Sequence, residues 1–196
     1  MPKFKRSKIF LLIGTVVFLF IFVFLPVLGH FGKKWHLVNL PFVIPMNEWE
    51  NFSSPEGKFS VWFPGVPDIT NVVSSVSNVD VSQPCYFIWN RQTEYAVGYG
   101  DWPKNLERLK PEQIFDIDQK GVATEVGKIV YQKDIEFENH SSREFEYVVD
   151  GKVRYSGRVR LILVSDRLYQ LMVIFLTANP HTTDRDIFFS SFRLQN

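Results

Sequence analysis

The chain has 196 residues, of which 45% are hydrophobic and 16% aromatic. This length suits one ordinary domain with room for an appendage, and the apolar content excludes wholesale disorder. The single cysteine excludes a disulfide framework and a multi-cysteine metal site, and the formal net charge of +1 argues against a polyanion-binding protein.

The charges are distributed unevenly along the chain. The first 47 residues carry six Lys and Arg and no acid, a net charge of +6. The remaining 149 residues carry 16 basic and 21 acidic side chains, a net charge of −5. The near-neutral total is therefore the sum of a basic N-terminal segment and an acidic domain, and the acidic domain argues against nucleic-acid binding.

The uncharged segment 9–28, IFLLIGTVVFLFIFVFLPVL, predicts a transmembrane helix. Twenty helical residues at about 1.5 Å each span about 30 Å, the thickness of the hydrocarbon core of a bilayer. A cleaved signal peptide is the first alternative, but the apolar run is long for one and no small-x-small site follows. A buried soluble helix is the second, and the segment lacks the polar stripe of such a helix.

The basic residues around the span predict its orientation. Four Lys and Arg lie in residues 1–8 and two follow the span, which favours a cytoplasmic amino terminus. Residues 29–47 then form a juxtamembrane linker. Residues 48–196 form one extracytoplasmic domain, in a periplasm, in a lumen or at the cell exterior.

Short apolar runs separated by turn residues predict strands in the first half of this domain. Phe59, Val61 and Phe63 alternate within Lys58–Phe63, and the sequence Pro-Gly-Val-Pro at 64–67 ends that strand. Further strands are predicted by the runs Ile69–Val76, Cys85–Trp89 and Tyr95–Gly100.

A helix is predicted from Pro111 to about Val126, since proline is favoured in the first helical turn. Its inward face would carry Phe115, Val122 and Val126, and Gly127 would end it. A shorter helix is predicted from the sequence Asn-Pro at 179–180 to about Phe189, with 190–194 closing the chain.

Two alternating runs around the sequence Asp-Gly at 150–151 predict a hairpin. A three-residue loop at 149–151 pairs Glu146 with Arg154 and Tyr147 with Val153. This register gives an aromatic core face and a charged outer face, whereas a two-residue turn would mix the two kinds of side chain. The next run, Leu168–Leu176, is apolar at both parities and predicts a central strand covered on both faces.

Arg154, Arg158 and Arg160 form the one basic stripe that the predicted strands contain. The neighbouring Glu144 and Glu146 favour a solvent-facing ladder of ion pairs. The alternative is a contact face for an anionic partner.

The residues that could support catalysis or metal binding do not form a recognisable motif, so neither a cofactor nor a metal is predicted. His140 and His181 fall in predicted connections. A hydrolase would be supported only if the fold clustered His140 or His181 with carboxylates in a cleft. Cys85 in a strand predicts a buried, inert thiol. Asp116 and Asp118 are interpreted as exposed helix polarity. The glycosylation sequons at Asn51 and Asn139 matter only in a host that modifies secreted proteins.

Three segments resemble PsbP-like domains and their bacterial relatives. They are Trp49–Val61 with Phe63–Pro67, the late strand Asp166–Leu171, and the closing segment Phe188–Leu194. The resemblance implies an α+β fold, an antiparallel sheet with helices packed on its faces. It also implies a non-enzymatic role, since PsbP proteins are extrinsic subunits that help to assemble or stabilise photosystem II. The predicted anchor departs from that family, so a photosynthetic role is not carried over.

The expected function is therefore non-catalytic. The domain would bind or scaffold a partner protein at the membrane surface, with the three arginines as a candidate contact face. The alternative is a carrier or sensor that binds a lipid or small molecule in an apolar pocket between sheet and helix. The residues predicted to form the core are Phe59, Val61, Tyr147, Tyr155, Tyr169 and Phe192.

Overall fold

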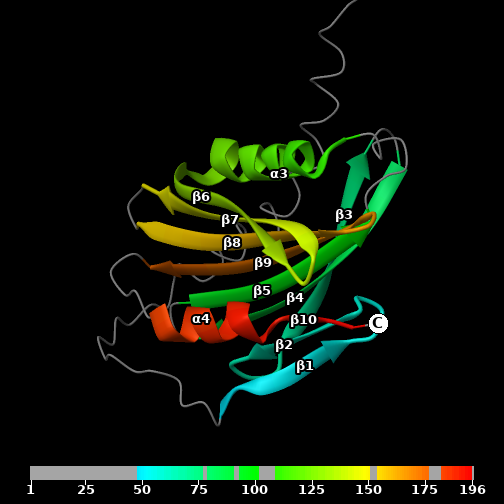
Figure 1. Ribbon diagram of the computed structural model, residues 1–196. Helices are drawn as coiled ribbons and strands as arrows, with labels where there is room; N and C mark the ends of the chain where they lie inside the picture. Colours follow the sequence, from blue (N-terminus) through cyan, green and yellow to red (C-terminus); the bar gives the residue numbers. More distant parts are fainter. Residues whose placement is uncertain are drawn as a thin grey trace, which may run out of the picture.

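An antiparallel sheet of seven strands, a smaller sheet of three strands and two helices make up the described fold (Figure 1). The computed structural model describes residues 48–195 apart from 77–78, 91–92, 102–108, 151–153 and 177–181. The predicted tail, transmembrane span and linker, and the Asn-Pro helix opening at 179–180, lie outside the described residues. Among the described helices, none is long and apolar enough to cross a membrane.

The large sheet has the strand order β3-β4-β5-β9-β8-β7-β6, and the small sheet has the order β1-β2-β10. Every described strand pair is antiparallel. The elements are β1 (Glu50–Ser54), β2 (Phe59–Phe63), β3 (Asp68–Val76), β4 (Val79–Asn90), β5 (Thr93–Asp101), α3 (Pro111–Val126), β6 (Lys128–Phe137), β7 (His140–Val149), β8 (Tyr155–Val164), β9 (Arg167–Leu176), α4 (Thr182–Ser191) and β10 (Arg193–Leu194).

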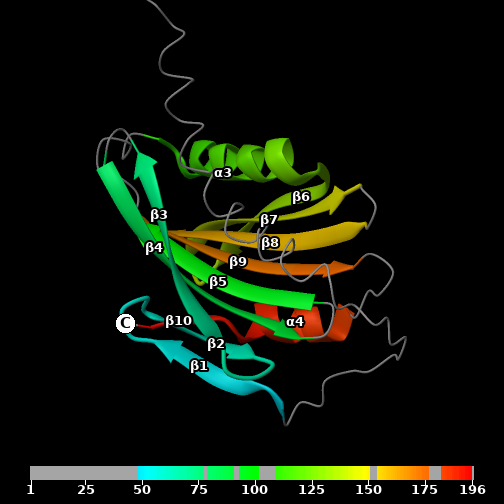
Figure 2. The ribbon, with the colours of Figure 1, turned by 180° about the vertical axis from the view of Figure 1, so that it is seen from behind.

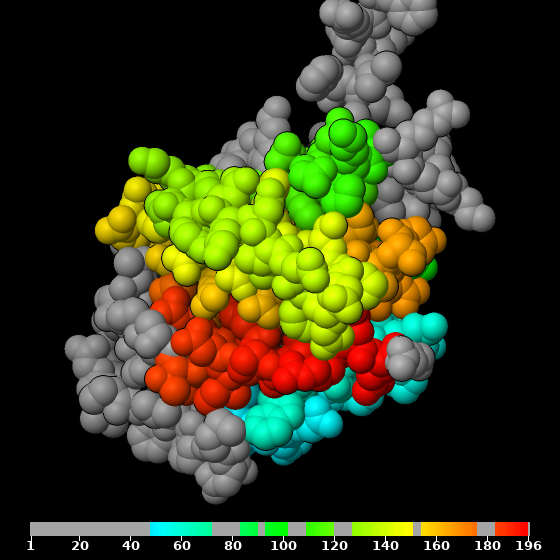
Figure 3. All heavy atoms as spheres, viewed as in Figure 1, coloured from blue at the N-terminus to red at the C-terminus, as the bar shows by residue number. Residues whose placement is uncertain are grey.

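The large sheet separates two apolar layers. α3 lies on one face, and α4 with the small sheet lies on the other (Figures 1 and 2). The space-filling view shows α4 and β10 as a red band between the β6–β7 hairpin and strands β1 and β2 (Figure 3). The α+β architecture with helices on both sheet faces confirms the predicted fold class.

β9 is the fourth of the seven strands and is covered on both faces, as its sequence predicts. Tyr169, Leu171 and Val173 point into the layer under α4, whereas Met172 and Ile174 point into the layer under α3. A strand with apolar side chains on both sides can be placed only where both faces exclude water. β9 therefore fixes the centre of the sheet.

The helix predicted from Pro111 and the predicted strands are found. β3, β4 and β5 extend beyond the predicted runs, whereas β2 is one residue shorter than predicted. α3 begins at Pro111 and ends at Val126, and β2 buries Phe59, Val61 and Phe63 on one side. Gly127 follows α3 in an extended conformation, and a Cβ there would collide with the carbonyl oxygen of Val148. Glycine is therefore needed for the close approach of two backbones, and the predicted helix-end geometry does not apply.

The predicted register of the β7–β8 hairpin is wrong. Val149 pairs with Tyr155, so five residues connect the strands, and Glu146 pairs with Arg158 instead of Arg154. The shift of four residues leaves each side chain on its predicted face, since side chains alternate with a period of two. It places Gly157 opposite Tyr147, where a Cβ would collide with the tyrosine ring.

Five of the six predicted core residues are buried, at 3% exposure or less, and Tyr155 is half-buried against the α3-side layer. Phe59 is the centre of the aromatic contacts under α4. Its ring centroid lies 5.5–6.2 Å from those of five other rings: Phe52, Tyr86, Tyr99, Tyr169 and Phe192.

We expect Phe59→Ala to lower the free energy of unfolding by about 3–5 kcal/mol, because it removes a fully buried ring and leaves a cavity among five aromatic side chains. Urea denaturation followed by circular dichroism measures this change. Val66→Ala, at a side chain that is 76% exposed, is the control and should change stability by less than about 0.5 kcal/mol. Equal effects of the two substitutions would contradict the central place of Phe59.

Candidate functional site

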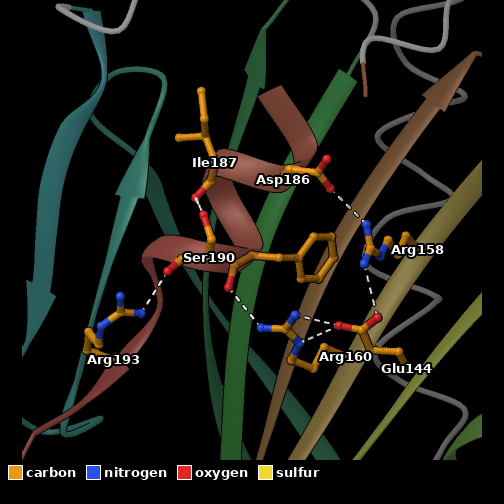
Figure 4. Close-up of polar contacts among 8 residues, drawn as sticks. Glu144, Arg158, Arg160, Asp186, Ile187, Ser190 and Arg193 are labelled. Carbon is orange, nitrogen blue, oxygen red and sulfur yellow. Dashed lines mark hydrogen bonds and ion pairs between the residues drawn. The ribbon is translucent and has the colours of Figure 1, made fainter. Parts of the chain in front are cut away.

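Two of the three predicted arginines meet one glutamate across the β7–β8 pair. Glu144 lies opposite Arg160 in the ladder, and Glu146 lies opposite Arg158. The Glu144 carboxylate accepts from Arg158 Nη2 at 3.0 Å and from Arg160 Nε at 2.8 Å and Nη2 at 2.5 Å (Figure 4). Acidic residues of β7 and basic residues of β8 on one sheet face thus form the predicted ion-pair ladder.

This ladder is not on an outer face. Glu144 is only 9% exposed, and the two arginines that bind it also contact α4 (Figure 4). Arg158 Nη1 reaches Asp186 of α4 at 3.0 Å, and Arg160 Nη1 donates to the Phe189 carbonyl at 2.8 Å. Both guanidiniums also lie over the Phe189 ring, 5.0 and 5.3 Å from its centroid. The expectation of a solvent-facing ladder is corrected: it holds α4 to the sheet.

Arg154 lies apart from the other two arginines. It precedes β8, its side chain is 60% exposed, and its Nε pairs with Asp150 at 3.1 Å. The structure brings Arg158 and Arg160 together and leaves Arg154 outside the strand. The three therefore do not form one continuous contact face.

Arg143 is a buried charge that the sequence analysis missed. It is 3% exposed and joins three elements. Its guanidinium contacts Asp134 of β6 and Asp116 of α3, each at 2.5 Å, and donates to Gln119 of α3 at 3.2 Å. Arg143 therefore fastens α3 to β6 and β7. Neither carboxylate is adjacent to it in sequence, so only the fold shows the connection.

The interpretation of Asp116 and Asp118 as exposed helix polarity is half right. The Asp116 side chain is 67% exposed, although it pairs with Arg143. Asp118 turns inward, and its Oδ2 is buried without a hydrogen-bond partner in the described part of the chain. Burial raises the pKa of Asp118 to about 7. Asp116 thus anchors α3 to the sheet, whereas Asp118 is buried without a hydrogen-bond partner among the described residues.

A second polar group is buried on the α3 face of the large sheet. Glu94 of β5 is fully buried, and within the described chain neither of its carboxylate oxygens has a hydrogen-bond partner. Burial raises the pKa of Glu94 well above its usual value, which favours the neutral acid. The predicted strand began at Tyr95, one residue after Glu94, so this carboxyl group was overlooked.

Glu94 belongs to a row of directly opposed residues that crosses six strands. In order across the sheet, the row consists of Trp89, Glu94, Ile174, Gly157, Tyr147 and Ile129. Directly opposed residues of antiparallel strands lie on the same face, with Cβ atoms about 4.5–5.5 Å apart. The row therefore places Trp89 beside Glu94, and Trp89 Nε1 is also buried without a partner among the described residues.

Tyr147 approaches Glu94 from the other side of the row. Its ring occupies the space over Gly157, and its hydroxyl lies 3.9 Å from the Met172 sulfur on β9. Burial first, and then the charge of Glu94, raise the pKa of the Tyr147 phenol. The tyrosine tip therefore points toward the strands that hold Glu94. Gly157 is the sequence signal that could have revealed this arrangement.

Small residues continue the β5 face beyond Glu94. Ala96, Gly98 and Gly100 follow at alternate positions on the same side of the strand. Cys85, opposite Gly98, is fully buried as predicted, and burial and then Glu94 raise the pKa of its thiol. The Glu94 carboxyl group thus lies in an apolar layer beside a tryptophan, a thiol and residues with little or no side chain.

The hydrolase alternative gains no support from the histidine that the structure describes. His140 opens β7, and its carbonyl accepts from Ser142 at 3.2 Å, whereas His181 lies outside the described residues. Within the described residues, no group of three or more His, Cys, Asp or Glu side chains could hold a metal ion.

Large apolar side chains are exposed where β2 passes into β3. Trp62, Val66 and Ile69 are 36%, 76% and 62% exposed. We refer to residues 62–69 as the β2–β3 connection. Val130 and Tyr131 are exposed at the opposite edge of the sheet, beside a register shift in β6. Grouped exposed apolar residues are typical of interaction surfaces.

The sequence matches no family model and no curated protein. Its structure is similar to the solution structure of PsbP from the cyanobacterium Synechocystis, with a TM-score of 0.51. The two chains are 12% identical, and the match covers 85% of this chain and 99% of the cyanobacterial one. The described domain therefore has a PsbP-like α+β fold. At this identity the similarity concerns the fold alone.

Two other solved structures show weaker similarity. A Pseudomonas aeruginosa protein of unknown function, suggested to be a regulator, matches with a TM-score of 0.44 at 9% identity, over 70% of this chain and 90% of its own. A Bacteroides thetaiotaomicron protein matches with a TM-score of 0.46 at 6% identity, over 76% of this chain and 49% of its own. This chain thus spans about half of the Bacteroides protein.

We expect Glu144→Gln to lower the free energy of unfolding by about 2–3 kcal/mol at pH 7, because it leaves two partly buried guanidiniums without their carboxylate. Burial alone would raise the pKa of Glu144, but Arg160 and Arg158 lower it below its usual value. The stabilisation by the ionised carboxylate is therefore present above about pH 4.3 and is lost as the pH falls through the lower folded-state pKa.

Urea denaturation between pH 2 and pH 7 measures both effects. Asp150→Asn removes the exposed pair with Arg154 and is the matched control, expected to cost less than about 1 kcal/mol. A Glu144→Gln variant as stable as this control would show that the ladder does not hold α4.

The stability of the protein should also depend on Asp118 near neutral pH. Its folded-state pKa of about 7 lies above the usual aspartate value, so the neutral form is favoured in the fold. The contribution of Asp118 to stability is then greatest below about pH 4 and declines as the pH rises toward 7. In Asp118→Asn this part of the decline should be absent, so stability should fall less with rising pH than in the wild type. Thermal denaturation from pH 4 to pH 8 measures it, with the exposed Asp68→Asn as control. Parallel pH profiles of wild type and Asp118→Asn would contradict the burial of the carboxylate.

Proposed function

We propose that the protein is a single-pass, membrane-anchored domain outside the cytoplasm that binds a partner protein without catalysing a reaction. The charge-free segment 9–28 and the +6 N-terminal region support the anchor and its orientation. The resemblance to PsbP domains supports a non-enzymatic role.

The observation that carries partner binding is the exposed apolar group at the β2–β3 connection. Trp62, Val66 and Ile69 lie within eight residues that contain a single charge, Asp68. Aromatic and apolar side chains with few charges are typical of the buried centre of a protein interface. The arginine ladder is less suited to this purpose, because its charges are already neutralised by Glu144 and Asp186.

A second candidate function is a carrier or sensor for an apolar small molecule. Glu94 and Trp89 favour it, because two buried polar groups that lack partners among the described residues are directly opposed on the same sheet face as α3. Each such group costs about 1–3 kcal/mol unless a hydrogen-bond partner is supplied. A ligand could supply that partner.

A photoreactive amino acid at position 66 or 69 of the full-length protein tests partner binding in intact native membranes. We expect a discrete crosslinked protein from each position, because both side chains lie in the proposed interface. Position 130, where Val130 is 55% exposed at the opposite edge of the sheet, is the matched control and should give no such product.

Three outcomes would contradict the proposal. If neither position 66 nor position 69 gave a crosslinked protein, the proposed binding of a partner protein would be contradicted. If position 130 gave the same crosslinked protein, the interface could not be assigned to the β2–β3 connection. A carboxyl-terminal reporter that is active only in the cytoplasm would remove the placement of the domain outside the cytoplasm.

A further inference from the structure

Trp89 and Glu94 have complementary hydrogen-bonding needs. The indole Nε1–H of Trp89 is a donor without an acceptor, and the carboxyl oxygens of Glu94 accept no hydrogen bond within the described chain. The two residues are directly opposed on β4 and β5, so their side chains leave the sheet on the same side. One small group placed between them could satisfy both.

We propose that this face of the large sheet binds an apolar molecule with a single hydroxyl group, whose oxygen accepts from Trp89 Nε1–H while its O–H donates to Glu94. The proposal rests on the carrier or sensor function and names the ligand class and the residues that hold it. It is independent of the β2–β3 connection. Ile69 pairs with Tyr86, which packs in the α4-side layer, on the opposite face of the sheet.

The surroundings favour an apolar body for this ligand. Ala96 and Gly98 leave little side chain on β5 beyond Glu94, and the side chain of Gln83 on β4 fills the space over Gly100. The neighbouring residues on β4 and β9 are the apolar Phe87 and Met172, both in the α3-side layer. An apolar ring beside the hydroxyl would contact Phe87 and Met172, and Gln83 over Gly100 would limit how far the ligand extends along β5.

The polar groups also discriminate between head groups. An ammonium group has no acceptor for Trp89 Nε1–H. An ionised carboxylate would be buried in an apolar layer, and the row of residues that holds Glu94 contains no cation to compensate its charge. A buried water molecule typically makes about three hydrogen bonds, and this pair of residues provides two in apolar surroundings. A hydroxyl group accepts from Trp89 and donates to Glu94, and the apolar part of the ligand excludes water from the site.

Cyclohexanol, cyclohexylammonium and cyclohexane are probes of nearly equal shape that differ in the head group. The full-length protein in lipid nanodiscs, labelled with ¹⁵N-tryptophan, reports binding through the indole resonance of Trp89, assigned by its loss in Trp89→Phe. We expect cyclohexanol to move this resonance downfield in a saturable manner. Cyclohexylammonium and cyclohexane should leave it in place, because neither accepts the indole proton.

Variants of Glu94 test the second contact. Glu94→Leu should weaken cyclohexanol binding by about tenfold or more, since the hydroxyl proton then has no acceptor. Glu94→Gln retains an acceptor oxygen and should bind within about threefold of wild type. Glu136→Leu, at an exposed glutamate of β6, is the matched control and should bind like wild type.

The outcomes separate failure of the site from failure of the carrier function. Cyclohexanol binding that Glu94→Leu does not weaken would overturn the site and leave the carrier function standing. Absence of binding by all three probes would overturn both. A Trp89 resonance that is already downfield without ligand, and that Glu94→Leu moves upfield, would show that the pair is satisfied within the protein, which also overturns the site.

Discussion

The burial of β9 on both faces is the constraint on which the rest of the structure depends. Because its side chains are apolar at both parities, water must be excluded from both sides of the sheet at this strand. On one face of the sheet, α4 and the small sheet cover the β9 side chains. On the other face, these side chains belong to the apolar cluster that includes Phe115 of α3. Every other element is placed by the need to complete one of these two layers.

The two layers deal with charge in opposite ways. Under α4, Glu144 collects two guanidiniums, and the carbonyl and ring of Phe189 complete the coordination of Arg160. A charge removed from water is tolerated when its partners are placed with good geometry, and this network joins α4 to the sheet. Under α3, Arg143 is satisfied in the same way, whereas Glu94 is not. Helix docking explains the first two groups and leaves Glu94 unexplained.

The sequence predicts those features that depend on local periodicity. The alternation of β2, the two-sided burial of β9 and the limits of α3 all follow from residues a few positions apart. The β7–β8 register could not be obtained in this way, because it depends on Tyr147 lying over Gly157, ten residues away. The surroundings of Arg143 and Glu94 also lie outside local periodicity, since Arg143 contacts Asp116 of α3, 27 residues away, and Glu94 lies opposite Ile174 of β9.

The position of Glu94 has no structural purpose that an apolar residue would not serve better. Among the described residues its carboxylate has no hydrogen-bond partner, and it lies in a row that otherwise consists of Trp89, Ile174, Gly157, Tyr147 and Ile129. A leucine there would pack in the same layer without the cost of burying a carboxyl group. Polar groups that lower stability are typical of sites where a protein meets a ligand. The cost of burying Glu94 without a hydrogen-bond partner in the described part of the chain therefore supports the proposed ligand site on the α3 side of the large sheet.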